Sequence, residues 1–354
     1  MNESFNNHGG NLSDVDIQRE MANGRIFIAP FDSKQLQPSG YNLTPTNFFY
    51  STKKRKFLLL HKNEEESYVI IDRSDTVLTI TRESIVISPT LTGAFYSKVK
   101  IVSEGFGHVS TTLDPNWEGQ LLISINNPTN HKLKFSIKKN VYGNEIYNSF
   151  VTLEFTYLNT PSLKIPDNPP WRLDILDTAI EKNISILKRN KIIILKELVE
   201  QLKSKKNNNI NFLIFQHLTK SEKEQWREIQ ILNDETEYNQ EQTAFIDSKK
   251  KKYLRLIQED FYINSIENIR LVNEFIDRKQ SYLPLRHLIF TFIKRYGYTI
   301  VGIVIVIALS AFLMNAGWMK LLPGENKQLS MTGMIIIYII YPMLKSFIDR
   351  WDRD

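Results

Sequence analysis

A proline-rich segment divides the sequence into two parts with different residue patterns. Residues 160–171 hold four of the 13 prolines, and proline fixes φ and lacks a backbone N–H donor. We therefore predict an extended linker over 159–171 between two folding units. The length of 354 residues suits about two domains, and the absence of cysteine excludes disulfides and zinc–thiolate sites.

The part before the linker has the pattern of a mostly β domain. From about residue 25 to 157, short runs of apolar and β-branched residues alternate with clusters of Asn, Asp, Gly, Pro and Ser. One short helix is predicted in front of them, because Ser13 is a good N-cap and Asn23-Gly24 is a stop signal. We place the β domain at 12–158 and a disordered N-terminus at 1–11.

The part after the linker has helical periodicity. Over 172–284, apolar residues recur every three to four positions between charged residues. This pattern predicts a cytosolic region of long amphipathic helices that pack on each other or on copies of themselves. The apolar positions do not keep a regular heptad, so a regular coiled coil is not predicted.

The C-terminal region, 285–354, carries two apolar runs. Residues 298–319 contain no charged residue, and a second run follows at about 331–348. Runs of this length cross the roughly 30 Å core of a bilayer, so we predict a two-helix transmembrane hairpin. More basic residues flank the pair than lie between the runs, which predicts a two-pass protein of the inner (cytoplasmic) membrane with both termini cytoplasmic. The net charge of +6 is modest for this length and does not by itself indicate nucleic-acid binding. Attraction to the anionic lipids of a membrane explains it, so we predict a lipid membrane as a partner and no nucleic acid.

Two segments of the β domain resemble the dCTP deaminase and dUTPase superfamily. In the first, a capped helix and a strand lead to Gln37-Pro38-Ser39-Gly40-Tyr41-Asn42-Leu43, which looks like the entry into the family's first motif. The second, Thr111 to Leu121, is similar to the third motif, in which an Asp-Pro turn precedes an aromatic residue, a glycine and a strand. The resemblance implies a mainly-β distorted barrel or jelly roll that forms homotrimers, with nucleotide sites between subunits.

The resemblance also implies the residues of a site. Asp114 matches the acid with which dUTPases activate water, although an Asp before Pro in a turn often only accepts backbone N–H groups. Ser124 stands where deaminases carry a catalytic Glu, and a serine cannot act as that base. Asn42 replaces the first-motif Asp. The second motif's phosphate-binding Arg becomes lysine, which loses the forked geometry of a guanidinium.

The candidate residues are therefore one catalytic position and a set of ligand-binding positions. Asp114 is the catalytic candidate, and the ligand-binding candidates are Ser39, Tyr41, Asn42, Lys98, Lys100, His108 and Asn148. Lys98 and Lys100 could instead be ordinary exposed lysines on a sheet, and Tyr41 could equally be a core residue. The six histidines lack the spacing of a metal site, so no metal ligands are predicted. No resident cofactor is predicted, and Mg²⁺ is expected only if the protein acts on a nucleoside triphosphate.

Three functions agree with the sequence. The first is a membrane-anchored, catalytically degenerate nucleotide-binding module that serves as a bacterial antiviral defence effector. The second is a membrane-tethered dCTP deaminase or dUTPase that acts on the nucleotide pool. The third is a trimeric anchored scaffold without a ligand.

Overall fold

The computed structural model describes most of the first 281 residues. The described residues are 10–108, 110–164, 166, 172, 174–176, 178, 197–198, 200–201, 210–231 and 240–281. By its contacts the chain divides into Met1–Gln280 and Ser281–Asp354, and all described residues except Ser281 belong to the first unit. Most of residues 172–209, the first part of the predicted helical region, lie outside the described residues.

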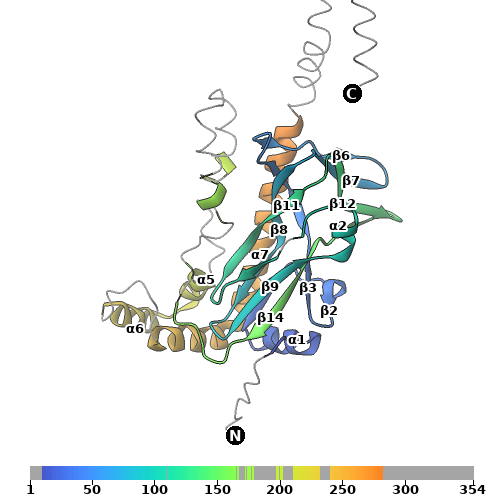
Figure 1. The fold of residues 1–354 in the computed structure, drawn as a ribbon. Helices are drawn as coiled ribbons and strands as arrows, with labels where there is room; N and C mark the ends of the chain where they lie inside the picture. Colours follow the sequence, from blue (N-terminus) through green and yellow to red (C-terminus); the bar gives the residue numbers. More distant parts are fainter. Residues whose placement is uncertain are drawn as a thin grey trace, which may run out of the picture. The chain divides into compact units, whose positions relative to one another are not determined.

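The N-terminal part is built from three antiparallel sheets (Figure 1). One sheet has the order β1-β8-β4-β5, with β11 also paired to β8: β1 (Ile26–Ala29), β8 (Asp75–Ile87), β4 (Pro45–Ser51), β5 (Lys56–Phe57) and β11 (Glu118–Asn127). Another has the order β10 (Ser110–Leu113), β9 (Leu91–Ser97), β14 (Val151–Tyr157), β3 (Gly40–Leu43) and β2 (Leu36–Gln37). The last has the order β13 (Asn144–Tyr147), β12 (Leu133–Val141), β7 (Glu66–Ile71) and β6 (His61–Lys62). The mainly-β prediction for this region is confirmed.

Short helices flank the strands. They are α1 (Asp14–Ala22), the 3₁₀ turn η1 (Ser33–Gln35) and α2 (Val99–Ser103). Helix α1 begins with a capping box, in which Ser13 Oγ accepts from the Asp16 N–H and Asp16 Oδ2 accepts from the Ser13 N–H. The predicted helix and its Ser13 cap are confirmed.

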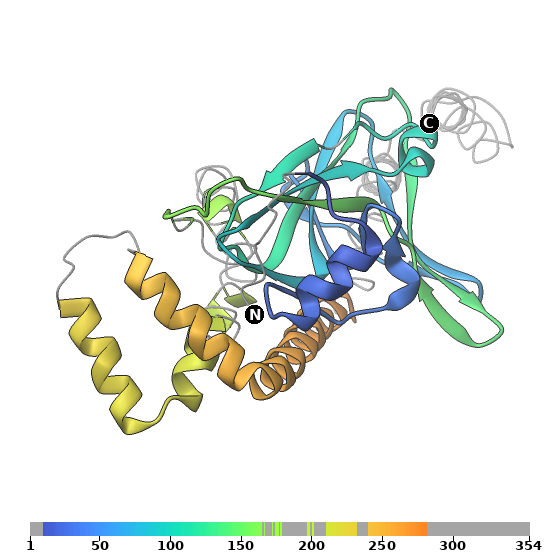
Figure 2. The ribbon, with the colours of Figure 1, turned by 90° about the horizontal axis from the view of Figure 1, so that it is seen from below.

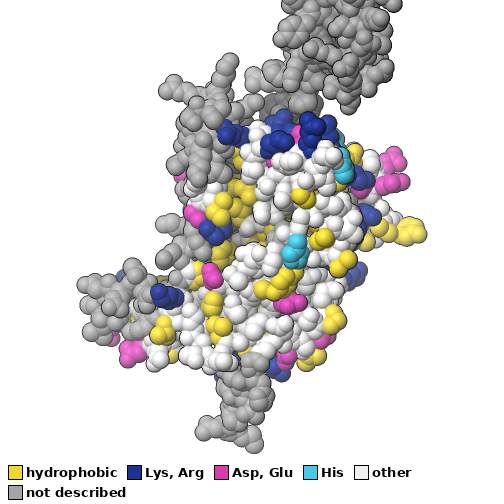
Figure 3. Space-filling model, viewed as in Figure 1, with side chains coloured by type: hydrophobic (Ala, Val, Ile, Leu, Met, Phe, Trp, Pro, Cys, Tyr) yellow, Lys and Arg dark blue, Asp and Glu magenta, His cyan; other side chains and the backbone are white. Residues whose placement is uncertain are grey.

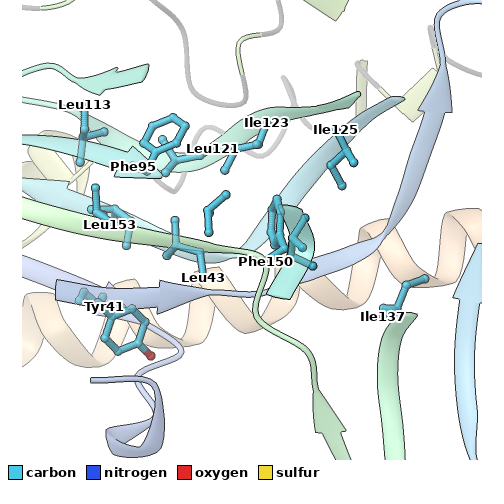
Figure 4. Close-up of a cluster of buried hydrophobic side chains, with 14 of the residues drawn as sticks. Tyr41, Leu43, Phe95, Leu113, Leu121, Ile123, Ile125, Ile137, Phe150 and Leu153 are labelled. Carbon is cyan, nitrogen blue, oxygen red and sulfur yellow. The ribbon is translucent and has the colours of Figure 1, made fainter. Parts of the chain in front are cut away.

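The core of the β part lies between the sheets. In β14, Val151, Leu153 and Phe155 are buried while the residues between them are partly exposed, which is the period of two expected of a strand with one buried face. Figure 4 shows side chains of β3, β9, β11 and β14 converging on this core, among them Leu43, Phe95, Leu121 and Leu153. The alternate residues of β9 and β14 are partly exposed, whereas β3 is buried throughout.

Helices cover another face of the β part. They are α5 (Ile210–His217), α6 (Lys220–Ile231) and α7 (Gln240–Ser281). Figure 2 shows that the first part of α7 lies beside α6 and that its later part runs along the β strands. In this later part, Val272, Phe275 and Ile276 pack in one apolar cluster with Phe48 and Ile80. The long helix thus completes the burial of a sheet that would otherwise expose apolar side chains.

The prediction of a two-pass membrane protein is corrected. None of the helices within the described ranges combines the length and the apolar character that a membrane span needs. Helix α7 has 42 residues, but charged residues such as those of Lys249–Lys252 interrupt it. The predicted spans, about 298–319 and 331–348, lie outside the described residues. The fold class is therefore a mainly-β region followed by a long helix, and the transmembrane hairpin, the inner-membrane localisation and the lipid partner are withdrawn.

The contact between α7 and the sheet gives a test of this architecture. Phe275 is 1% exposed and lies edge-on to Phe57, with ring centroids 6.3 Å apart. We expect Phe275→Ala to lower the free energy of unfolding by about 3 to 5 kcal/mol, because it removes a buried ring and leaves a cavity. The measurement is urea unfolding of the full chain. Ile263→Ala, at a position 62% exposed on the same helix, is the control and should change stability by less than about 0.5 kcal/mol.

Candidate functional site

Three neighbouring strands place polar side chains in one row, in which Tyr96 is 38% exposed and Asn42 only 4% exposed. The register sets Asn42 of β3 opposite Thr152 of β14, and Thr152 opposite Tyr96 of β9. The Thr152 hydroxyl donates to Asn42 Oδ1 at 2.8 Å. The ring of His108 stacks on that of Tyr96, with centroids 6.5 Å apart. Asn42 and His108, both predicted as ligand-binding residues, thus lie at the two ends of this row.

Lys98 lies just beyond the end of β9, next to this row. Its Nζ donates to Ser149 Oγ at 2.8 Å, and its backbone N–H donates to Phe150 O at 3.1 Å. Burial, and secondarily the positive charge of Lys100, lowers the pKa of the Lys98 ammonium. No carboxylate of the described residues forms an ion pair with Lys98, whereas Lys100 lies 4.0 Å from Glu104. Lys98 is therefore a half-buried cation whose charge is not neutralised.

Asn148 comes next to Lys98 because it precedes Ser149 in the chain. Its backbone N–H donates to Ile137 O at 2.8 Å, and its Nδ2 donates to Ser136 Oγ at 2.9 Å. We call Lys98, Asn148 and Ser149 the Lys98 cluster. Ammonium, amide and hydroxyl groups are donors that phosphate and carbonyl oxygens accept. The Lys98 cluster and the neighbouring row therefore form the candidate site.

The outer surface around these strands is sparsely charged. Figure 3 shows few charged side chains over β9 and β11, whereas Lys and Arg side chains gather at the end where β6 and β7 lie in Figure 1. An uncompensated lysine on such a face creates a locally positive potential, because few neighbouring charges oppose it.

Three other predicted residues lie apart from the Lys98 cluster. Ser39 is exposed in the turn between β2 and β3. Tyr41 is fully buried in the core, and its hydroxyl accepts from the Asp32 N–H at 2.9 Å. Asp114 is exposed in the turn after β10, four residues beyond Ser110, which pairs with Tyr96. Four strand residues span about 13 Å, so one copy of the chain does not bring Asp114 to the Lys98 cluster.

Two charged residues inside β8 were not predicted as site residues. Glu83 is 2% exposed, and its carboxyl oxygens accept from the Thr44 N–H at 2.8 Å and the Thr44 hydroxyl at 2.5 Å. Burial raises the pKa of Glu83 to about 7. Arg82 lies beside it with its guanidinium 3.6 Å from the centre of the Tyr147 ring. The sequence signal was the charged pair Arg82-Glu83 inside an otherwise apolar and β-branched strand.

No metal centre is evident in the part of the chain that the structure describes. There, no three side chains of His, Asp or Glu come together in a way that could hold a metal ion.

Comparison with known proteins identifies the type of domain. A family model described as dCTP deaminase-like matches residues 11–141. The dCTP deaminase of Pyrococcus horikoshii is 27% identical over 158 residues, which cover 45% of this chain and 86% of that protein. The N-terminal domain is dCTP deaminase-like. The resemblance to the dCTP deaminase and dUTPase superfamily is thereby confirmed for this part of the chain, and the fusion to transmembrane helices is not shown.

Other similar proteins match smaller shares of this chain. The dUMP-forming dCTP deaminase of Acidothermus cellulolyticus is 27% identical over 130 residues, covering 33% of this chain and 68% of that protein. Among solved structures, dCTP deaminase from Agrobacterium tumefaciens is 14% identical with a TM-score of 0.32, covering 42% of this chain. This match spans about half, 49%, of the Agrobacterium chain. The EIAV dUTPase is 16% identical with a TM-score of 0.22, covering 34% of this chain and 96% of that one.

The buried carboxyl of Glu83 predicts a pH dependence of stability. Its pKa rises from an ordinary 4.5 to about 7 on folding, so between these values the folded state holds a proton that the unfolded state has released. The free energy of unfolding should therefore fall as the pH rises through this range. Glu83→Gln, which mimics the protonated carboxyl, should remove roughly 2 to 3 kcal/mol of this fall.

The measurement is urea unfolding at several pH values between 4.5 and 7.5. Glu64→Gln, which changes an exposed glutamate, is the matched control and should keep the pH profile of the original chain. Identical pH profiles for Glu83→Gln and the original chain would show that folding does not raise the pKa of the Glu83 carboxyl.

Proposed function

We propose that the dCTP deaminase-like domain binds a nucleotide at the Lys98 cluster without efficient turnover. The observation that carries this proposal is the Lys98 ammonium, which is half-buried, bonded to Ser149 and not neutralised by a carboxylate of the described residues. Burying a cation without an opposite charge is unfavourable, and an anionic ligand would offset that cost. The similarity to dCTP deaminases makes a nucleotide the natural anion.

The side chains next to the Lys98 cluster also suit the sugar and base of a nucleotide. Asn42 and Thr152 are linked by their side chains, and the rings of Tyr96 and His108 provide a partly exposed aromatic surface beside them. Amide and hydroxyl groups bind the polar edges of sugar and base, and an aromatic ring stacks on a base.

Two features support binding without efficient turnover. Ser124, where the resemblance implies the deaminase glutamate, is exposed on β11 and cannot accept a proton as a carboxylate does. Asp114 lies four strand residues, or about 13 Å, beyond Ser110, which pairs with Tyr96 of the row next to Lys98. The alternative of an active deaminase or dUTPase rests on Asp114 alone.

A homo-oligomer is part of the proposal. The resemblance to the dCTP deaminase and dUTPase superfamily implies nucleotide sites between subunits. The trimer implied by the resemblance is the arrangement we propose. The antiviral role depended on the predicted membrane spans and is not carried forward.

Lys98 gives the direct test of this function. We expect the full chain to bind dCTP or dUTP, and Lys98→Met to weaken binding about tenfold or more, because a charged hydrogen bond contributes about 1.5 to 3 kcal/mol. Lys251→Met removes an exposed lysine of α7 and should leave the affinity unchanged. The measurement is isothermal titration calorimetry of the purified chain.

Chromatography of the same mixtures tests the absence of turnover. We expect the nucleotide to be recovered intact. Conversion that Asp114→Asn abolishes would establish the enzyme instead, and absence of binding to any nucleotide would contradict the proposal and favour a scaffold.

A further inference from the structure

We infer that Arg82 is a second cation of the nucleotide site and binds a phosphate group of the ligand. This inference rests on the proposed function, because it adds a residue to the site around Lys98. Two observations support it: the position of Arg82 in β8, and a guanidinium that has no ion-pair partner among the described residues.

Backbone hydrogen bonds connect Arg82 to Lys98 through two intervening segments, Leu43-Thr44 and Phe150. The Arg82 N–H donates to Thr44 O at 2.8 Å, and the Phe150 N–H donates to Leu43 O, one residue earlier, at 3.1 Å. The Lys98 N–H donates in turn to Phe150 O at 3.1 Å. Four segments that are distant in the sequence are thus joined side by side.

The side chains follow the same arrangement. The Arg82 guanidinium contacts the Tyr147 ring, and the Lys98 ammonium contacts Ser149 two residues later. Two residues of chain span at most about 7 Å. The segment from Tyr147 to Ser149 therefore holds a guanidinium at one end and an ammonium at the other.

The Arg82 guanidinium has unused donors. Its Nε is buried without a hydrogen-bond partner, and no carboxylate in the described ranges forms an ion pair with it. The nearest carboxylate in the sequence, Glu83, directs its two oxygens to Thr44. Because burial raises the pKa of Glu83 to about 7, this carboxyl is only partly ionised near neutral pH and offsets little of the charge of Arg82.

Stacking on Tyr147 prepares Arg82 for a phosphate. The ring covers the flat face of the guanidinium and holds it in place, while the N–H groups lie in the plane of the guanidinium and point outward. A fork of in-plane donors matches two phosphate oxygens at once. Lys138 lies 5.7 Å from the centre of the same ring, but Glu145 neutralises it.

The pair of cations selects the chemical class of the ligand. Two positive charges at the two ends of one short segment favour a ligand with more than one phosphate group over a monophosphate. The site should therefore prefer a nucleoside triphosphate. Arg82 would provide the bidentate hydrogen bonding to phosphate that the second motif lacks because a lysine stands there in place of arginine.

The test compares dCTP with dCMP on the full chain by calorimetry. We expect Arg82→Gln to weaken dCTP binding about tenfold and to reduce the preference for dCTP over dCMP. Arg73→Gln, which removes an exposed arginine, is the matched control and should bind both ligands as the original chain does. Inorganic triphosphate should compete with dCTP for the original chain and compete less well for Arg82→Gln.

A second variant separates recognition from folding. Arg82→Lys keeps the charge and most of the alkyl chain but loses the fork, so we expect it to fold with an unchanged urea midpoint and still to bind dCTP several-fold more weakly. If the original chain binds dCTP and both variants bind it equally well, the inference about Arg82 is wrong and the proposed function stands. If the original chain binds no nucleotide, the proposed function fails and the inference with it.

Discussion

Burial of strand β8 on both faces is the constraint on which the rest of the structure depends. Val77, Ile85 and Ile87 face the core between the sheets, whereas Ile80 and Val86 pack with the helical part. A strand covered on both sides must carry side chains that are apolar or hydrogen-bonded, and β8 also pairs with β1, β4 and β11. The β domain and the helices therefore share this strand and stabilise each other through it.

The same burial gives the polar residues of β8 their properties. Glu83 exchanges water for two hydrogen bonds from Thr44, which do not fully replace hydration, so its pKa rises to about 7. The guanidinium of Arg82 stacks on the ring of Tyr147 at the margin of the core. Charged groups in such positions are costly, and a ligand that pairs with them recovers part of that cost.

The helical part is joined to the β domain by polar as well as apolar contacts. Glu118, at the start of β11, accepts from the N–H of Ile210 at 3.1 Å, and burial raises the pKa of this carboxyl to about 7. Because Glu118 lies four residues after Asp114, the first residue of α5 is tied to the strand that follows the Asp114 turn.

The sequence by itself determined the local features of this protein. Alternating apolar residues predicted the strands, Ser13 predicted the start of α1, and the segments around Asn42 and Asp114 indicated the superfamily, because each signal is encoded within a few neighbouring residues. Only the tertiary structure decided that Tyr41 is a core residue, that Lys98 lies beside Ser149, and that Arg82 and Lys98 contact the two ends of Tyr147–Ser149. These relations depend on contacts between strands that are distant in the sequence, such as that of Lys98 with Ser149, 51 positions later. The pairing of such strands is not encoded within any one run of neighbouring residues.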